Sequence, residues 1–342
     1  MGVAWRLGGV LGRRVSIWDI AEEAGVSITT VSHALSGKGR LPDRTREKVR
    51  RAARRLGYRA STQARGLATG RSMALAVQVV GTRAGVLVPD FQYFVELLNA
   101  ASAEAIERGY GLVLAPAGAG IEGLGHLSPD GIVVVDPTGE EPLLQPRGIP
   151  VVTAARVPED GRETAWVDSD HHAGTRRVLD HFLEAGRSRP ALLTSTARQS
   201  YVDDTTAAYT TWCKERGLEP IVGLVAADPT EEAAAAVMGD LLTTKPRPDA
   251  VYATFDRMAL GVLLACRERR ISVPEDLAVA ALTDSPLLRT TVPQITALDL
   301  DAPEIGRRVI ELLVALVEGE EPASRQIMVP STLIVRESTR HP

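Results

Sequence analysis

The sequence of 342 residues predicts a small all-α domain followed by a larger, two-lobed α/β domain. Between residues 16 and 57, apolar residues recur at helical spacing, which indicates a bundle of short helices. From Met73 onward, short apolar runs alternate with helical patterns, and this alternation predicts parallel sheets covered by helices. Roughly 270 residues are long for a single sheet of this kind, so we expect two α/β lobes.

The first two helices are predicted from their capping residues. Ser16 and Asp19 have the spacing of a capping box, in which the hydroxyl and the carboxylate satisfy free backbone amides. Gly25 can end the first helix in a left-handed conformation, and Ser27 can cap a second one. The apolar face of the first helix would consist of Ile17, Ile20, Ala21 and Ala24.

The second helix combines an apolar inner face with a small, polar outer face. Its inward residues are Val31, Ala34 and Leu35, whereas Ile28, Thr29, Thr30 and His33 lie near its start and face outward or nearly so. Such a helix fits the major groove of DNA, where hydroxyl and imidazole groups can read base edges. On this motif alone, a helical bundle without any ligand is an equally good interpretation.

A third helix and the distribution of charge favour DNA. The third helix is predicted from Thr45 to Leu56, with Val49, Ala52 and Ala53 closing the core and Gly57 ending it. Residues 1–72 contain 15 Lys and Arg against 5 Asp and Glu, whereas the remainder of the chain has an excess of acidic residues. A basic domain attracts phosphates and releases counterions on binding, and here the basic residues coincide with the helix-turn-helix.

Residues 15–72, VSIWDIAEEAGVSITTVSHALSGKGRLPDRTREKVRRAARRLGYRASTQARGLATGRS, resemble the head of the lac and purine repressor family. The resemblance implies a hinge helix around Ala64–Ala68 that enters the minor groove, with Leu67 as an apolar wedge between base pairs. Gly66 is a poor helix former, so we expect the hinge to fold only on DNA. The family's base-reading positions correspond to Ile28, Thr29 and His33, and this histidine resembles the purine branch.

The resemblance also assigns further DNA contacts and domain limits. It implies a DNA-binding domain over 15–58, a hinge and linker over 59–71 and an effector-binding and dimerisation domain over 72–342, after a loose extension over 1–14. Pro42 departs from the family, which usually has a serine cap there. The implied DNA-contacting residues are Ser16, Ser27, Ile28, Thr29, Thr30, Ser32, His33, Tyr58, Ala64, Arg65 and Leu67.

The second domain is predicted from eight strands and four helices. The strands fall at 73–79, 110–116, 130–136, 149–155, 189–195, 220–226, 249–255 and 276–282, and the helices at 93–109, 175–186, 207–217 and 258–269. Residues 248–282 and VRES at 335–338 are similar to the family's periplasmic-binding-protein-like domain. That resemblance implies two lobes that close on a small ligand, with chain crossings near residues 165, 295 and 325.

The ligand cleft implied by the resemblance departs from the family's polar pattern. An arginine before the helix near Ala207, an asparagine and an aspartate of the family are replaced here by Thr205, Phe255 and Thr283. With fewer fork-shaped donors and more aromatic faces, we expect common monosaccharides and their phosphates to bind poorly. Filling of the lobe cores by these rings, or a loss of small-molecule control, are the alternatives. The implied effector contacts are Phe91, Tyr93, Phe94, Arg156, Asp170, Tyr201, Thr205, Phe255, Asp256, Thr283 and Asp284.

Other motifs are weaker. Residues 118–123 form a GxGxxG pattern, but no helix follows that could hold a dinucleotide. The cluster DSDHH at 168–172 reads as helix caps, since consecutive histidines on a helix point in different directions, so we expect no metal site. Cys213 and Cys266 are each placed in a helix, which fits a reducing cytoplasm. The chain has no catalytic motif and no apolar run long enough for a membrane span.

The sequence is therefore interpreted as a cytoplasmic transcriptional regulator, not an enzyme, that needs no cofactor. Two chains would pair, bind a near-palindromic stretch of double-stranded operator DNA, and respond to a small-molecule effector between the lobes. A dimer is expected because VRESTRHP at the end of the sequence contains no heptad helix for a tetramer. The alternatives are a secreted or transport-type ligand-binding protein and a nicotinamide-dependent enzyme.

Overall fold

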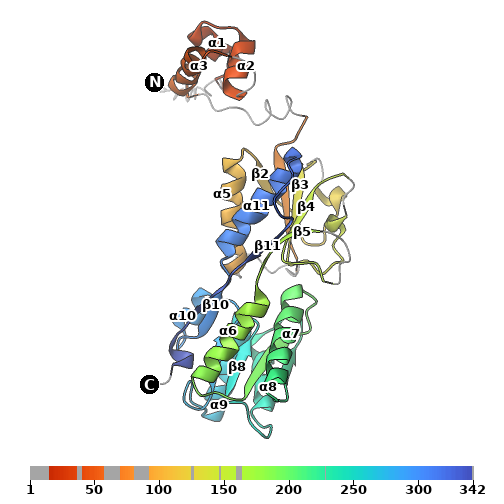
Figure 1. Ribbon diagram of the computed structural model, residues 1–342, viewed down its shortest axis with the longest axis vertical. Helices are drawn as coiled ribbons and strands as arrows, with labels where there is room; N and C mark the ends of the chain where they lie inside the picture. The colour runs from red at the N-terminus through yellow and green to blue at the C-terminus, as the bar shows by residue number, and fades with distance from the viewer. Residues whose placement is uncertain are drawn as a thin grey trace, which may run out of the picture. The chain divides into compact units, whose positions relative to one another are not determined.

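The computed structural model describes residues 15–36, 41–57, 70–80, 92–124, 127–145, 148–158, 164–227 and 229–340. The chain divides into two compact units, Met1–Gly70 and Arg71–Pro342. Figure 1 shows the first unit as helices alone and the second as two lobes of strands and helices. The predicted fold class is confirmed.

The first unit is a bundle of α1 (Ile17–Ala24), α2 (Ile28–Ser36) and α3 (Asp43–Arg55). The predicted capping box is present, because the Asp19 carboxylate accepts a hydrogen bond from the Ser16 amide at 2.7 Å. Gly25 ends α1 with a φ of 56°, in the left-handed region. The core of the bundle contains the fully buried Ile20, Val31 and Val49.

Helix α3 begins two residues earlier than predicted, at Asp43 instead of Thr45. Pro42 stands at its N-cap position and supplies no side-chain cap. Its fixed φ of −58° fits the entry to a helix, and the acidic Asp43 in the first turn favours the positive end of the helix dipole. The helix therefore forms without the cap that serine provides in the family.

The second unit contains two six-stranded sheets, one in each lobe. Sheet A, in the first lobe, has the spatial order β11 (Gln326–Val329), β5 (Ala165–Ser169), β4 (Val151–Ala154), β3 (Gly131–Val135), β1 (Ala74–Val79) and β2 (Gly111–Leu114). Sheet B, in the second lobe, has the order β12 (Thr332–Ile334), β10 (Thr296–Asp299), β9 (Ala278–Ala281), β8 (Ala250–Ala253), β6 (Pro190–Ser195) and β7 (Ile221–Val225). The pairs are parallel except for β10 and β12.

Helices cover the sheets as parallel strands require. Sheet A packs against α5 (Gln92–Glu107) and α11 (Ala302–Glu318) on one face, and against the short η2 (Ile121–Leu124) and η3 (Pro142–Leu144) on the other. Sheet B packs between α6 (His171–Glu184) with α7 (Ser200–Glu215) and α8 (Glu231–Leu241) with α9 (Asp256–Arg269). The second lobe also contains α10 (Pro286–Thr290) and η4 (Glu337–Thr339).

The chain crosses between the lobes three times, each about five residues later than predicted. The crossings lie between β5 and α6 near residue 170, between β10 and α11 near residue 300, and between β11 and β12 near residue 330. The predicted points, near 165, 295 and 325, instead mark the starts of β5, β10 and β11, because each of these strands adds to a sheet before the chain leaves its lobe.

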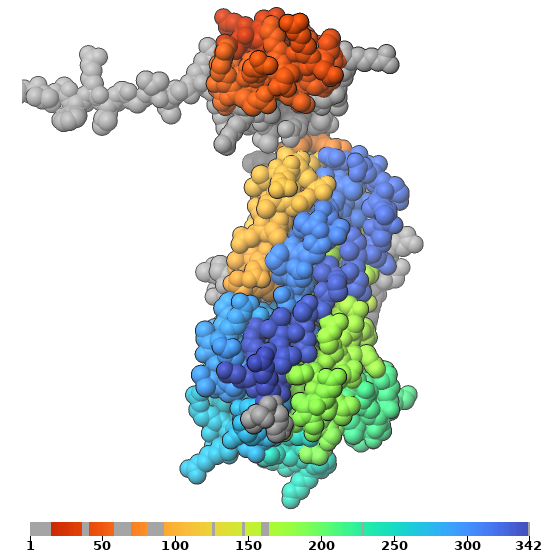
Figure 2. Space-filling model, turned by 60° about the vertical axis from the view of Figure 1, so that its left-hand side comes forward, coloured from red at the N-terminus to blue at the C-terminus, as the bar shows by residue number. Residues whose placement is uncertain are grey.

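Helices α5 and α11 lie side by side along the first lobe (Figures 1 and 2). Gly306 of α11 permits this close approach. A Cβ atom at Gly306 would lie 3.0 Å from the carbonyl carbon of Leu97 and 3.1 Å from the amide nitrogen of Ala101, and closer still to the Leu97 oxygen. The backbone of α5 therefore occupies the space that any other residue at position 306 would need.

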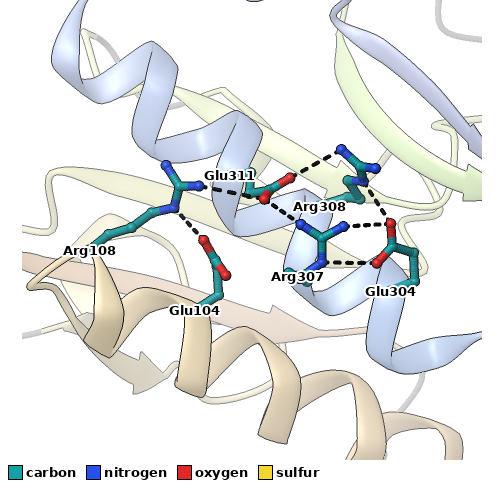
Figure 3. A network of polar contacts seen from close by, with 6 residues as sticks. All are labelled: Glu104, Arg108, Glu304, Arg307, Arg308 and Glu311. Carbon is teal, nitrogen blue, oxygen red and sulfur yellow. Dashed lines mark hydrogen bonds and ion pairs between the residues drawn. The ribbon is translucent and has the colours of Figure 1, made fainter.

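An ionic network on the surface of this helix pair adds a second link (Figure 3). Arg108, which directly follows α5, pairs with Glu104 of α5 at 2.5 Å and with Glu311 of α11 at 3.5 Å. The other pairs join residues within α11: Glu304, Arg307, Arg308 and Glu311. Because the network is partly exposed, it contributes less to the helix contact than the buried packing does.

The substitution Gly306→Ala should destabilise the protein. Alanine favours helices over glycine, but here its methyl group meets backbone atoms that cannot rotate away. We expect a loss of about 1–3 kcal/mol in the free energy of unfolding, measured by urea denaturation. Gly111→Ala is the control, since a Cβ atom there has Met73 oxygen as its nearest neighbour at 3.9 Å. A Gly306→Ala protein as stable as wild type would contradict the close approach.

Candidate functional site

The first candidate site is the outer face of α2. Thr29, Ser32 and His33 are exposed and have the spacing of neighbours on one helix face, while Val31 and Ala34 are buried beneath them. The other predicted contacts on this helix are less accessible, since Ile28 and Thr30 are only half-exposed.

Ser27 is exposed just before α2, and its hydroxyl accepts a hydrogen bond from the Thr30 amide at 3.2 Å, as expected of a cap. Ser16 is half-buried, in the capping box that begins α1. The predicted contacts that lie outside the described residues are Tyr58, Ala64, Arg65 and Leu67.

The second candidate site is a cavity of about 140 Å³ between the two lobes. It lies where strands of both sheets end, which is where open α/β sheets bind ligands. A volume of this size accepts a molecule on the scale of a single ring. The predicted effector residues that line it are Tyr93, Phe94, Tyr201, Phe255, Asp256, Thr283 and Asp284.

Aromatic rings from three helices and one loop surround this cavity. Tyr201 of α7 and Phe255, just before α9, meet edge to face with centroids 5.7 Å apart. His171 of α6 lies 6.0 Å from the Tyr201 ring, and Tyr93 and Phe94 of α5 form another edge-to-face pair at 5.5 Å. These rings offer faces and edges suited to a flat or apolar part of a ligand.

Asp284 is a structural anchor as well as a lining residue. Its carboxylate accepts hydrogen bonds from Arg336 at 2.8 Å and from Arg289 at 2.8 and 3.2 Å. Burial alone would raise the pKa of Asp284, but the two guanidinium groups outweigh it and hold the pKa below its usual value. The negative charge of Asp284 is therefore already compensated within the second lobe.

Asp136 has the opposite environment. It follows β3 at the edge of the cavity, and no hydrogen bond from the described residues reaches its carboxyl group. Burial, and then the nearby charge of Asp168, raise its pKa to about 7, against a smaller opposing effect of His171. Burial and the charge of Asp136 in turn raise the pKa of the Tyr93 and Tyr201 hydroxyls well above the usual value, so both remain protonated donors.

Three predicted effector residues do not line the cavity. Arg156 lies beside it, where its guanidinium pairs with Asp168 at 3.4 Å and with Asp204 of α7. Asp170 caps α6 through a 2.8 Å hydrogen bond from the Ala173 amide. Thr205 is fully buried inside α7, because that helix begins at Ser200 and not near Ala207. Phe91 lies outside the described residues.

Several lining residues were not among the predicted effector contacts. Asp168 and His171 come from the segment that the sequence presents as helix caps, and Gln199 precedes α7. Asp136 has a positive φ of 50° at the end of a buried strand, and an acidic residue at that position was a usable signal. The others of note are Gln92, Thr254, Arg257 and Ser285.

The weaker motifs have structural explanations. Residues 118–123 lead into the single turn η2 rather than a crossover helix. His171 is buried and the side chain of His172 is 55% exposed, so they point in different directions, and no cluster suited to a metal ion occurs among the described residues. Cys213 and Cys266 are buried in α7 and α9, in separate cores. Within the described ranges, no helix is both long and apolar enough to cross a membrane.

Two family models match the chain. Residues 16–61 match the model of bacterial regulatory proteins of the lacI family, and residues 179–339 match that of a periplasmic binding protein-like domain. The first match covers the helix-turn-helix and the second covers most of the second lobe together with α11 and β11.

Individual proteins match over nearly the whole chain. The HTH-type transcriptional regulator CelR of Thermobifida fusca is 30% identical over 339 residues, which span 95% of this chain and 98% of the relative. A CelR–cellobiose complex aligns with a TM-score of 0.69 at 27% identity, covering 95% of this chain and all of that one. A lac repressor dimer bound to operator and an anti-inducer shares the fold, with a TM-score of 0.72 at 22% identity over 96% and 99% of the two chains.

The architecture and the cleft define a two-lobed ligand-binding regulator with a helix-turn-helix. The chain belongs to the LacI family of transcriptional regulators, whose matched members are regulators and not enzymes.

The substitution Asp136→Asn should stabilise the protein at neutral pH. The folded state keeps a proton on Asp136 up to about pH 7, whereas the unfolded chain loses it near the ordinary pKa of 3.8. The folded state therefore binds more protons in this window, and stability falls as the pH rises through it. We expect Asp136→Asn to gain on the order of 1–3 kcal/mol at pH 8 and nothing at pH 4, measured by urea denaturation.

Asparagine suits this test because it tolerates the positive φ of residue 136. Asp240→Asn, on the exposed surface of α8, is the control and should leave the pH dependence unchanged. A variant that is less stable than wild type at pH 8 would show that Asp136 is held as a favourable anion.

Proposed function

We propose that this protein represses or activates genes by binding a near-palindromic operator as a homodimer, under the control of a small molecule in the interlobe cleft. The observation that carries the proposal is the outer face of α2, where Thr29, Ser32 and His33 are exposed to solvent while the inner face packs into the core of the bundle. Helices of this kind read base edges in the major groove. A regulator that acts on genomic DNA works in the cytoplasm.

The remainder of the DNA-binding proposal rests on the sequence. The limits 15–58 for the DNA-binding domain, 59–71 for the hinge and 72–342 for the effector domain remain proposals, as does the wedge role of Leu67. The division of the structure between Gly70 and Arg71 supports the last limit. Exposed arginines on α3, including Arg54 and Arg55, support phosphate contacts by the same unit.

Exposed apolar residues on edge strands support pairing of two effector domains. Leu114 on β2 is 54% exposed at one edge of sheet A, and Leu224 on β7 is 58% exposed at one edge of sheet B. Proteins rarely leave an apolar edge strand exposed to solvent, because its unpaired backbone N–H and C=O groups can bind another chain. A second copy of this chain would cover both edges, and a two-fold dimer would present two heads to two half-sites.

The cleft supports small-molecule control. A bound ligand would contact both lobes and so favour one angle between them, which is the requirement for a change in DNA affinity. We retain the expectation that simple monosaccharides bind poorly. The effector contacts that the cavity supports are Tyr93, Phe94, Tyr201, Phe255, Asp256, Thr283 and Asp284, whereas Arg156, Asp170 and Thr205 would act indirectly.

The test is operator binding by the full chain, with the operator selected from random DNA. Specific affinity should fall steeply with salt, and each neutralised phosphate should add about −0.9 to the slope of log K against log salt.

Thr29→Ala should weaken specific binding by about 1–3 kcal/mol and relax the preference for particular DNA sequences. Leu67→Ala should lose specific affinity and DNA bending together, since the wedge acts only on kinked DNA.

Thr206→Ala is the control, because that hydroxyl bonds only to the Val202 carbonyl within α7, outside the head. Non-specific binding should survive in both head variants. A nearly flat salt dependence would overturn the DNA-binding proposal, and a Leu67→Ala protein that bends its operator like wild type would overturn the wedge.

A further inference from the structure

The four acidic residues that line the cleft differ in how their charges are compensated. Asp284 is paired with Arg336 and Arg289. Asp168 is 3% exposed and accepts hydrogen bonds from the Arg156 amide at 3.1 Å and the Ser169 amide at 2.8 Å, in addition to its pairing with the Arg156 guanidinium. Asp136, in contrast, forms no ion pair and receives no hydrogen bond at its carboxyl group from the described residues, and the basic group that acts on it is His171. One acidic group in the cavity is therefore left for a ligand.

Asp256, the fourth acid, has only local compensation. It begins α9 and accepts a hydrogen bond from the Arg257 amide at 2.7 Å, as expected at the positive end of a helix. The Arg257 side chain turns to Glu231 of α8, at 3.3 Å. The lining of the cavity is thus acidic overall.

Three further buried polar atoms in the same cavity lack hydrogen-bond partners among the described residues; the Ser285 hydroxyl can both donate and accept, and the other two can serve as acceptors. The Gln199 side-chain oxygen is buried and receives no hydrogen bond from the described residues. Nδ1 of His171 is likewise buried without a hydrogen-bond partner among the described residues, and the His171 side chain is 5% exposed. Its Nε2 lies 3.4 Å from the Asp168 carboxylate, which favours a proton on Nε2 and leaves Nδ1 as an acceptor. Buried acceptors without donors are costly, so a ligand that donates hydrogen bonds would relieve them.

We propose that the effector of this cleft is a protonated amine with a ring or an apolar group attached. An ammonium group has three donors and no acceptor, which matches a cavity with an uncompensated carboxyl group and two unpartnered acceptors. The aromatic rings of Tyr93, Tyr201 and Phe255 offer faces to the cation and to the ring of the ligand. The proposal rests on the effector function proposed above.

A neutral polyol fits this cavity less well. Sugar hydroxyl groups are read best by side chains that both donate and accept, such as the asparagine of the family, and Phe255 stands at that position here. A hydroxyl group also supplies no positive charge to offset the proximity of Asp136 and Asp168. An ammonium group supplies a positive charge, and a buried positive charge is stable when it is paired with a carboxylate such as that of Asp136.

The groups around Asp136 determine how binding should depend on pH. Asp168 on β5 is the nearby negative charge, His171 on α6 is the basic group, and Tyr93 on α5 and Tyr201 on α7 are neutral hydroxyls. Because burial and the charge of Asp168 raise its pKa to about 7, Asp136 holds its proton to a much higher pH than an ordinary aspartate does. A cation displaces that proton, so amine binding should release protons near pH 7 and strengthen between pH 6 and pH 8.

The experiment measures ligand binding to the full chain by calorimetry. Each pair of probes has the same carbon skeleton and differs only in carrying an amine or a hydroxyl group. The pairs are benzylamine with benzyl alcohol and cyclohexylamine with cyclohexanol, and cellobiose and glucose are the neutral sugars. Each amine should bind about tenfold or more tightly than its alcohol at pH 8, as a charged hydrogen bond in a dry site predicts. Titrations in two buffers of different ionisation enthalpy should detect the released proton.

The variant Asp136→Asn should abolish the preference for amines, and its folding is not in question because we expect it to be more stable than wild type. Asp240→Asn should keep the preference. Equal binding of amine and alcohol, or an amine preference that survives Asp136→Asn, would overturn the proposal. Binding of cellobiose but of neither amine would overturn it too, while leaving the effector function of the cleft intact.

Discussion

The two lobes are joined by three chain crossings that are held together at one place, and the geometry of the cleft depends on that junction. The Ser169 hydroxyl, at the first crossing, donates to the Leu300 carbonyl at the second, at 3.2 Å. Arg177 of α6 donates to the Ser331 carbonyl at the third, at 2.6 Å. Gly174 of α6 leaves room for the same segment, since a Cβ atom there would lie 2.8 Å from the Ser331 hydroxyl oxygen. The junction restricts the lobes to hinge motion.

Beside this junction, Arg156 connects the lobes directly. It extends from the end of β4 in the first lobe, pairs with the buried Asp168, and reaches Asp204 of α7 in the second lobe. Removing such a partner leaves a buried carboxylate uncompensated, which is costly. The sequence-based assignment placed Arg156 among the effector contacts, whereas in the structure it lies beside the cavity and pairs with Asp168 and Asp204.

The strands of the effector domain could be predicted where burial makes them continuous apolar runs, as in 131–135 and 250–253. The prediction omitted the four strands adjacent to the crossings. Of these, β5 contains Trp166 and Asp168, and the others are short, so their apolar signal is weak. Helices α8 and α11 were also omitted, although in α11 Ile305, Val309 and Leu312 recur at helical spacing and are buried against sheet A. That signal was present in the sequence.

The cleft could be predicted only in part. Family resemblance located Tyr93, Tyr201, Phe255 and Asp284 in the cavity. It could not reveal that Asp284 is already compensated by two arginines from distant positions, or that Asp136 is not. These properties depend on which strand ends the topology brings together, and sequence spacing does not contain that information. Thr205 was misplaced because the start of α7 was predicted seven residues too late.

The central claim is that the angle between the lobes controls the affinity for DNA, and locking the lobes tests it most directly. Glu140 in the first lobe and Arg198 in the second form an exposed pair across the cleft. In a Glu140→Cys, Arg198→Cys protein, a short bismaleimide would fix the lobes, while the natural Cys213 and Cys266 are buried. Operator affinity should then change by about 5-fold or more relative to the unlinked protein, as an allosteric coupling of 1–3 kcal/mol requires. An identical affinity before and after cross-linking would contradict the account.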